Sequence, residues 1–330
     1  MIGAVEEAMP GDCGRSMRQN FYTPSCGRTA SETRLTSVGI IMLRHLYFLG
    51  LLLLLSPMVT SARETSGDES PAFTTVPELS AGFDLLYEQR FAEARKAFTD
   101  WESSNPKEPL GEVAVAASYL FEELSRHGVL TSNFFLDQKR FLQGIDGKPD
   151  SEQMKYFREA LAQAEQLARD RQKATPNDGE ALFALTLAAG MESDASSILE
   201  KKHLEALRSM KEANKYAKLL LVQHPDAADA YVALGIANYI IGSLNAGSRV
   251  ALWFGGIHGD KKLGMEQVAK TAENGRYLLP FAKIVLALAA RRENQTALAQ
   301  KLLRELTEQY PKSALFASEY AKVMSVPAGD

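Results

Sequence analysis

Apolar residues recur every three or four positions along most of the chain after residue 77. In the segment from Ser151 to Thr175 these apolar residues are Met154, Phe157, Leu161, Ala164 and Leu167. Such spacing places side chains on one face of an α-helix. The segment Glu112–Leu124 is apolar on most sides, which indicates a helix buried between neighbours. No stretch alternates apolar and polar residues as a strand would. The pattern therefore predicts an all-α domain over residues 77–324.

Four of the predicted helices share a second pattern, an alanine followed twelve residues later by a proline. The pairs are Ala94–Pro106, Ala164–Pro176, Ala213–Pro225 and Ala299–Pro311. The residue four positions after each alanine is also apolar; these residues are Phe98, Ala168, Ala217 and Leu303. A small residue lets two helices approach, the next apolar residue fills the groove between them, and proline ends the helix. This spacing predicts helix-turn-helix repeats.

The repeat resembles a known family. Gly82-x11-Ala94-x3-Phe98-x7-Pro106 is similar to the tetratricopeptide (TPR) repeat, in which the glycine sits where the first helix touches the second. Ala287-x11-Ala299-x3-Leu303-x7-Pro311 keeps the same frame. The resemblance covers residues 78–324 and implies a TPR-like α-solenoid of about five helix pairs with insertions. Ala314–Met324 is expected to be the C-terminal capping helix, followed by a tail over residues 325–330.

Two insertions separate the helices of the middle repeats, at Gly128–Pro149 and Glu192–His203. The first is rich in large apolar residues, namely Phe134, Phe135, Leu136, Phe141 and Leu142. Because exposed apolar patches are uncommon in monomers, we expect a short helix folded into the groove of the solenoid. The alternative is a hydrophobic lip that meets a partner or lipid. The second insertion carries Glu192, Asp194 and Glu200, which lack the spacing of a calcium loop and predict a solvated turn.

Residues 42–62 are predicted to be a signal peptide. Arg44 and His45 precede an apolar run, Leu46–Leu55, and small residues end at Ala62. The run is shorter than the roughly 20 residues that cross a bilayer, so we expect cleavage rather than a retained anchor, and no transmembrane span afterwards. The predicted location is the periplasm or the medium of a bacterium. Residues 1–41 lack a hydrophobic period and are expected to be disordered or to precede the true start; residues 63–76 are expected to be a linker.

The positions of the cysteines and the net charge exclude some classes of function. Cys13 and Cys26 both precede the signal peptide, so no disulfide framework or thiol chemistry is expected after it. The net charge is −4. This mild acidity argues against nucleic acid as a partner, because nucleic acid favours a basic face.

A glycine-rich stretch, predicted to be irregular, departs from a plain solenoid at residues 242–262. Its segment Gly256-Ile257-His258-Gly259-Asp260-Lys261-Lys262-Leu263-Gly264 resembles part of the eukaryotic TPR family linked to inclusion-body clearance and lipid droplets. In that family a Gly-Phe-x-Gly-Asp-Arg-x-x-Gly run opens a comparable helix. Here Ile257 replaces the aromatic residue and Lys261 the arginine. The resemblance spans residues 237–288 and implies a shared structural module.

Two interpretations of this stretch remain open. In the structural one, Asp260 caps a helix, and Gly255, Gly256 and Gly259 permit positive φ or close backbone approach. In the functional one, six residues line a pocket for a ligand or partner: Phe134, Phe135, Trp253, Phe254, His258 and Lys261. A single histidine does not make a metal site, and the other histidines share no ligand spacing with it.

No catalytic motif accompanies these features. The chain has no phosphate-binding loop, no Gly-x-Ser-x-Gly elbow and no His-Glu-x-x-His, so no catalytic residue, cofactor or metal is predicted. The sequence favours an exported, non-enzymatic TPR-like scaffold that binds a protein or peptide partner in the cell envelope. The alternative is a carrier or sensor of a small apolar ligand or lipid, held inside the solenoid by Phe134, Phe135, Trp253 and Phe254. A hydrolase with an unrecognised site is a third hypothesis. An open apolar cavity would favour the carrier function. A filled groove with a polar concave face would favour the scaffold function.

Overall fold

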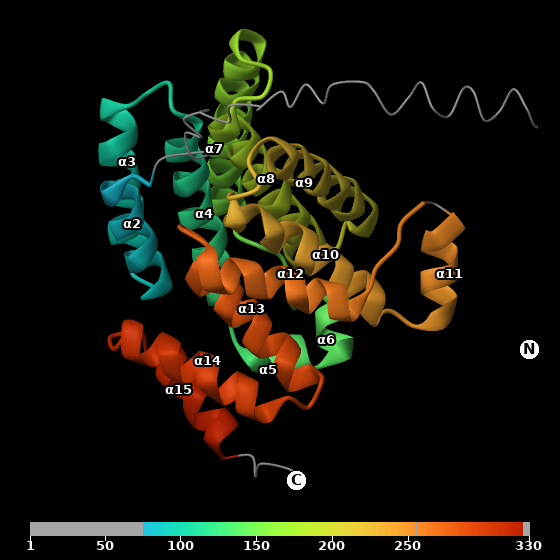
Figure 1. Cartoon of the computed structure of the whole chain (residues 1–330). Helices are drawn as coiled ribbons and strands as arrows, with labels where there is room; N and C mark the ends of the chain where they lie inside the picture. Colours follow the sequence, from blue (N-terminus) through green and yellow to red (C-terminus); the bar gives the residue numbers. More distant parts are fainter. Residues whose placement is uncertain (1–74, 255, 326–330) are drawn as a thin grey trace, which may run out of the picture. The chain divides into compact units, whose positions relative to one another are not determined.

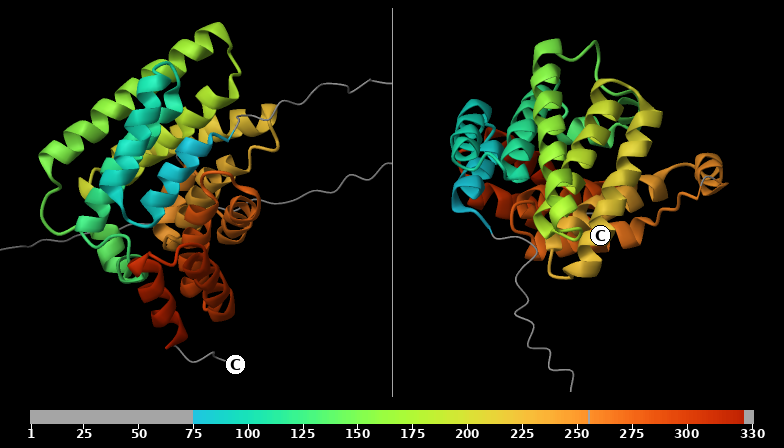
Figure 2. Two further views of the ribbon diagram at one scale, coloured as in Figure 1. Left: turned by 90° about the vertical axis from the view of Figure 1, so that its left-hand side faces the viewer. Right: turned by 90° about the horizontal axis from the view of Figure 1, so that it is seen from above.

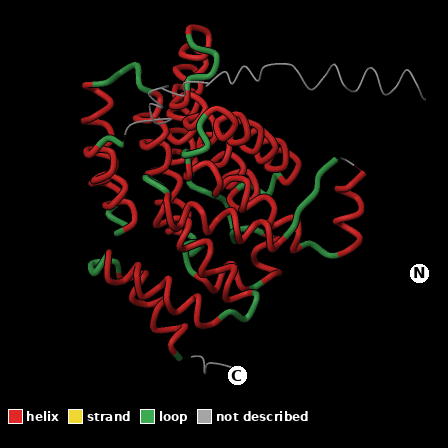
Figure 3. The backbone as a smooth tube through the Cα atoms, in the orientation of Figure 1, coloured by secondary structure: helices red, strands yellow, loops and turns green. Residues whose placement is uncertain are grey.

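Helices provide all the regular secondary structure of the residues that this computed structural model describes, 75–254 and 256–325 (Figures 1 and 3). The chain divides into two units, Met1–Gly67 and Asp68–Asp330, and every described residue belongs to the second. The all-α prediction is therefore confirmed for the described part of the chain. The predictions for the signal peptide, for Gly255 and for nearly all of the linker and tail lie outside it.

Most of the helices are long. They are α2 (Pro77–Tyr87), α3 (Phe91–Ser104), α4 (Pro109–Arg126), α7 (Ser151–Ala174), α8 (Gly179–Asp194), α9 (His203–Gln223), α10 (Tyr231–Ser243), α11 (Ala246–Phe254), α12 (Lys261–Asn274), α13 (Leu279–Arg292), α14 (Thr296–Gln309) and α15 (Ala314–Met324). The short elements are α5 (Ser132–Leu136), α6 (Gln138–Gln143), a π-helix (Ala195–Leu199) and a 3₁₀ turn (Ala228–Ala230).

The prolines of the repeat pattern end four of these helices. Pro106, Pro176, Pro225 and Pro311 each follow closely after the last residue of a helix, which is α3, α7, α9 or α14. At the other end, a proline begins α2 and α4, where its missing N–H leaves no helical hydrogen bond unmade.

Helices that follow one another in the chain pack side by side (Figure 2). The sequence of contacts runs from α2 through α3, α4, α7, α8 and α9 to α10, and continues from α10 through α12, α13 and α14 to α15. In the first pair Gly82 of α2 lies against the ring of Phe98 in α3, where a Cβ atom would overlap the ring. Phe98 is fully buried, so the glycine sets how closely these two helices approach.

The first helix also contacts the C-terminal part of the domain. The Val76 N–H donates to the Tyr277 hydroxyl (2.7 Å), and the Tyr87 hydroxyl donates to the Tyr277 carbonyl (2.9 Å). The Tyr277 ring lies 5.4 Å from the ring of Phe83, between centroids. The turn between α12 and α13 is thereby fixed to α2.

The structure differs from the sequence predictions in two segments. Glu192 and Asp194 belong to α8, and the helix continues as a π-helix to Leu199, so the prediction of a solvated turn was wrong. Ile198 and Leu199 are buried, and their burial keeps this segment folded against its neighbours. The stretch predicted as irregular contains α11, whose first turn is capped by Asn245 accepting from the Ser248 N–H at 2.9 Å.

Candidate functional site

Two adjoining apolar cavities lie between the helices, with volumes of about 240 and 410 Å³. They share lining residues from α2, α4, α6, α8, the π-helix, α10, the residue after it, and α13. These residues are Leu86, Tyr87, Phe121, Phe141, Leu142, Asp194, Ser197, Ile198, Ile236, Ile240, Leu244 and Phe281. Nearly all are hydrophobic, so the space favours apolar over polar occupants.

One wall comes from α10, whose sequence is apolar on all sides. Its face with Gly235 packs on α12, where a Cβ atom at Gly264 would lie 2.7 Å from the Gly235 carbonyl oxygen. The opposite face places Ile236 and Ile240, four residues apart, toward the cavities. Because the glycine face is occupied by α12, the branched side chains of the other face remain available to line the open space.

A second wall comes from the first insertion. Asp137 caps α6 by accepting from the Lys139 N–H at 2.9 Å. After α6, the Ile145 N–H donates to the Ile198 carbonyl at 2.9 Å, which ties the insertion to the π-helix. This places Phe141 and Leu142 in the lining of both cavities. The first insertion therefore forms two short helices, α5 and α6, where the sequence predicts one.

Asp194 is the acidic residue of the shared lining. It is the last residue of α8, next to the π-helix, and its side chain makes no hydrogen bond or ion pair with any other described residue. Burial raises the pKa of Asp194 to about 7. In the sequence, a carboxylate at the end of an otherwise apolar helix is the signal for an acidic residue in the cavity wall. Asp194 was predicted instead to lie in a solvated turn.

Other polar groups of the lining have protein partners. The Tyr239 hydroxyl donates to Glu293 at 3.0 Å, and burial raises the pKa of Tyr239 to about 12. Arg292 donates from Nη1 to the Phe135 carbonyl at 3.0 Å. The described lining therefore contains an unpaired carboxylate, whereas its guanidinium group and its tyrosine hydroxyls are already engaged.

The residues predicted to form a pocket are not brought together. Phe134 is buried in the core, packed on Phe135 with ring centroids 5.4 Å apart, and only Phe135 of this pair lines a cavity. Trp253 and Phe254, at the end of α11, are 58% and 79% exposed. Trp253 lies 6.3 Å from His258, between ring centroids. The aromatic residues of the first insertion and those of α11 thus lie in different parts of the fold.

The remaining predicted residues are structural in their contacts. Lys261 pairs with Glu293 at 2.8 Å. Asp260 is the N-cap of α12 and accepts from the Leu263 N–H at 2.9 Å. Gly259 lies against α10, where a Cβ atom would come within 2.8 Å of the Asn238 carbonyl oxygen, and Gly256 has a positive φ of 72°.

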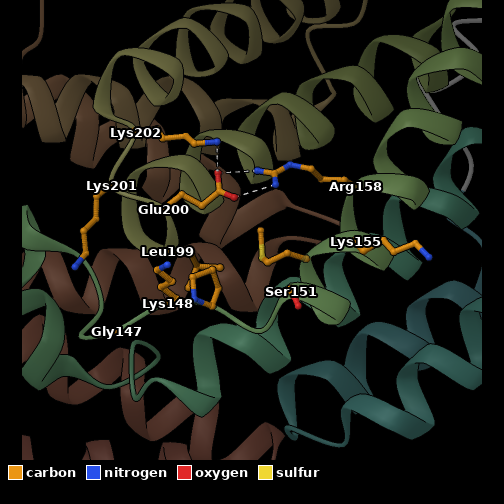
Figure 4. Close-up of a pocket in the computed structure, with 11 residues that line it drawn as sticks. Gly147, Lys148, Ser151, Lys155, Arg158, Leu199, Glu200, Lys201 and Lys202 are labelled. Atoms are coloured by element: carbon orange, nitrogen blue, oxygen red, sulfur yellow. Dashed lines mark hydrogen bonds and ion pairs between the residues drawn. The ribbon is translucent and has the colours of Figure 1, made fainter.

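A further pocket, of about 630 Å³, is open and basic. Figure 4 shows Glu200 between Arg158 and Lys202 in this pocket. Glu200 accepts from both terminal nitrogens of Arg158, at 2.9 and 2.8 Å, and pairs with Lys202 at 3.1 Å. The hydrogen bond from Arg158 lowers the pKa of Glu200. Two of the basic groups of this pocket are therefore neutralised within the protein.

Neither a cluster of metal-ligating side chains nor a helix long and apolar enough to cross a membrane occurs among residues 75–254 and 256–325. Comparison of the chain with protein-family models and with curated protein sequences gives no match.

Proposed function

We propose that this protein is a non-enzymatic carrier or sensor that binds a small apolar ligand or lipid between its helices. The observation that supports this function is the open apolar space lined by α2, α4, α6, α10 and α13. Ligand pockets typically have volumes of about 300–1,000 Å³ and mostly apolar walls with few polar groups. The larger cavity, at about 410 Å³, falls in this range.

The proposal includes a TPR-like solenoid exported to the periplasm or the medium. The contact of Gly82 with Phe98 supports the repeat, because it occupies the position at which the family's glycine meets the second helix. The aromatic residues of the first insertion, Phe135 and Phe141, contribute to the cavity. Trp253 and Phe254 of the glycine-rich stretch do not, so the ligand would be held by the first insertion and by α10.

Binding of the neutral fluorophore N-phenyl-1-naphthylamine to the purified full chain tests this function. We expect saturable binding with one or two molecules per chain. Gly190 of α8 lines the larger cavity, and open space surrounds the position of a Cβ atom there. Gly190→Leu should fill this space and weaken binding about tenfold or more, because it removes volume from an apolar pocket. Gly190→Ala is the matched control, since it adds one methyl group at the same position.

Two results would contradict the carrier. One is the absence of saturable binding to the unsubstituted chain. The other is equal affinity of the Gly190→Leu and Gly190→Ala variants. Because leucine and alanine are both good helix formers, neither substitution should unfold α8.

A scaffold for a protein or peptide partner is a second function, favoured by α11. Val250, Trp253 and Phe254 are exposed on this helix, and Figures 1 and 2 show it set apart from the other described helices. Exposed aromatic residues are typical of protein interfaces. A photo-crosslinker at Phe254 should capture one partner in the cell envelope, and Trp253→Ser should abolish the capture if α11 binds that partner. Capture that is unaffected by Trp253→Ser would contradict this role.

A further inference from the structure

The unpaired carboxylate of Asp194 requires a physical explanation. Asp194 is half-buried, and a carboxylate that loses part of its hydration is ordinarily compensated by a cation or by hydrogen-bond donors. Asp194 has no such compensation within the described residues, although it lies in the wall shared by both apolar cavities. The Asp194 carboxylate is therefore free to accept hydrogen bonds from a molecule that enters the cavities.

The local backbone supports the same conclusion. Asp194 stands at the junction where α8 becomes a π-helix, a rare geometry found frequently at functional sites. The junction is held in place on both sides. The Ser193 hydroxyl donates to the Ala206 carbonyl of α9 at 3.0 Å, and the Ile198 carbonyl accepts from the Ile145 N–H. The position of Asp194 is therefore set by the fold.

The charged and titratable groups that line the cavities limit what Asp194 could pair with. They are His203 and Arg292, each at one cavity only, and the hydroxyls of Tyr87 and Tyr239. Tyr87 donates to the Tyr277 carbonyl and Tyr239 to Glu293, while Arg292 donates to the Phe135 carbonyl. None of them forms a hydrogen bond or an ion pair with Asp194, so its carboxylate is available to a ligand.

We infer that Asp194 determines ligand specificity, and that the ligand is an amphipathic amine. Its apolar body fills the space beside Ile236, Ile240 and Phe281, and its protonated amino group donates hydrogen bonds to the Asp194 carboxylate. An ammonium group provides both the charge and the N–H donors that this carboxylate lacks. This inference rests on the proposed carrier function and adds the chemical class of the ligand.

Three ligands with the same alkyl chain test the inference: dodecylamine, dodecanol and dodecanoate. Each is titrated at pH 8, below its micelle concentration, against N-phenyl-1-naphthylamine bound to the full chain. We expect dodecylamine to bind about tenfold or more tightly than dodecanol, as for a hydrogen bond between charged groups. Dodecanoate should bind most weakly, because its charge repels Asp194.

Asp194→Asn removes the charge with almost no change in shape. In this variant dodecylamine should lose its advantage over dodecanol, while the affinity for dodecanol stays within about twofold, which also shows that the variant is folded. Asp146→Asn, the same change at an exposed carboxylate that lines neither cavity, is the control and should keep the preference for the amine.

The possible failures are distinguishable. If none of the three ligands displaces the fluorophore, the carrier function and this inference both fail. If dodecanol displaces it but dodecylamine is no better, or if the amine preference survives in Asp194→Asn, only the role of Asp194 is overturned. Tightest binding of dodecanoate would overturn it as well.

Discussion

The Tyr310 hydroxyl donates a hydrogen bond to Asp84 Oδ1 at 2.9 Å, across 226 residues of sequence. Tyr310 follows α14, and Asp84 lies in α2, so this bond joins the first described helix to the end of α14. Burial, followed by the hydrogen bond and charge of Asp84, raises the pKa of Tyr310. The neighbouring residues Leu86 and Tyr87 line both cavities, and Phe316 lines the smaller one. The bond therefore helps to hold together a wall of the proposed ligand site.

Tyr310→Phe should lower the free energy of unfolding by about 1 kcal/mol, the usual net contribution of a hydrogen bond, and by more if Asp84 is left without a donor. Urea unfolding monitored by circular dichroism measures the change. Tyr156→Phe is the matched control, because Tyr156 donates an exposed hydrogen bond to Glu152 within α7, and the loss of this bond should have little effect. Equal stability of the two variants would show that the contact between α2 and Tyr310 contributes nothing.

Gly82→Ala should destabilise the protein by about 2 kcal/mol, because added atoms in a packed core force neighbouring groups to move. The new Cβ atom would overlap the ring of Phe98, which is fully buried. Gly190→Ala provides the contrast. It is also in a helix but has open space around it, so alanine should be neutral or stabilise by roughly 1 kcal/mol through helix propensity. Thermal unfolding of both variants gives the comparison, and similar shifts of Tm would refute the packing role of Gly82.

The helices were predictable because their signals are local. The alanine and proline of each pair are close in sequence, and the prolines end α3, α7, α9 and α14 as the spacing predicted. The contact between Asp84 and Tyr310 was not predictable, because nothing in either segment specifies a partner more than 200 residues away. That pairing depends on how all the helices between them pack.

The candidate site was predicted only in part. Phe135 lines a cavity, as expected of an aromatic residue in the first insertion, whereas Phe134 next to it points into the core. Trp253 and Phe254 lie on exposed α11, since composition alone does not tell whether an apolar insertion folds inward or outward. Asp194 was missed because its environment is created by α4, α6, α10 and α13, which are remote in sequence.

Asp260→Ala should lower the free energy of unfolding by about 1 kcal/mol, the usual cost of removing an N-cap. The Asp260 carboxylate accepts from the Leu263 N–H at the start of α12, and alanine leaves this N–H without a protein acceptor. His258→Ala is the control, because His258 is exposed and should be nearly silent. Thermal unfolding measures both. If Asp260→Ala left Tm unchanged, the cap would be unimportant, and His258 and Asp260 would become candidates for a binding site.

The pKa values of Asp194 and Glu112 predict that stability falls as pH rises from about 5 to about 8. Burial raises the pKa of Asp194 to about 7, and burial with the charge of Glu102 raises that of Glu112 to about 7. Between the ordinary carboxyl pKa and 7 the folded state therefore binds more protons than the unfolded state. Stability decreases with pH wherever this holds. The stability that these two carboxyl groups contribute is fully present below their pKa in the unfolded chain. This contribution is lost as the pH rises through their pKa in the folded protein.

Asp194→Asn should remove part of this dependence. Between pH 5 and pH 8, the free energy of unfolding of the variant should rise by on the order of 2 kcal/mol relative to that of the unsubstituted chain. One pKa unit corresponds to about 1.4 kcal/mol, and the expected change is smaller than the full pKa shift would give because the carboxylate keeps some contact with water. Urea unfolding of the ligand-free protein at both pH values measures the difference. Because His203 also lines one of the cavities, both proteins are compared again in a His203→Gln background. The two proteins could instead differ in their free energy of unfolding by the same amount at pH 5 and at pH 8. That result would mean that Asp194 is hydrated in solution, and the cavity wall would then offer a ligand no buried carboxylate.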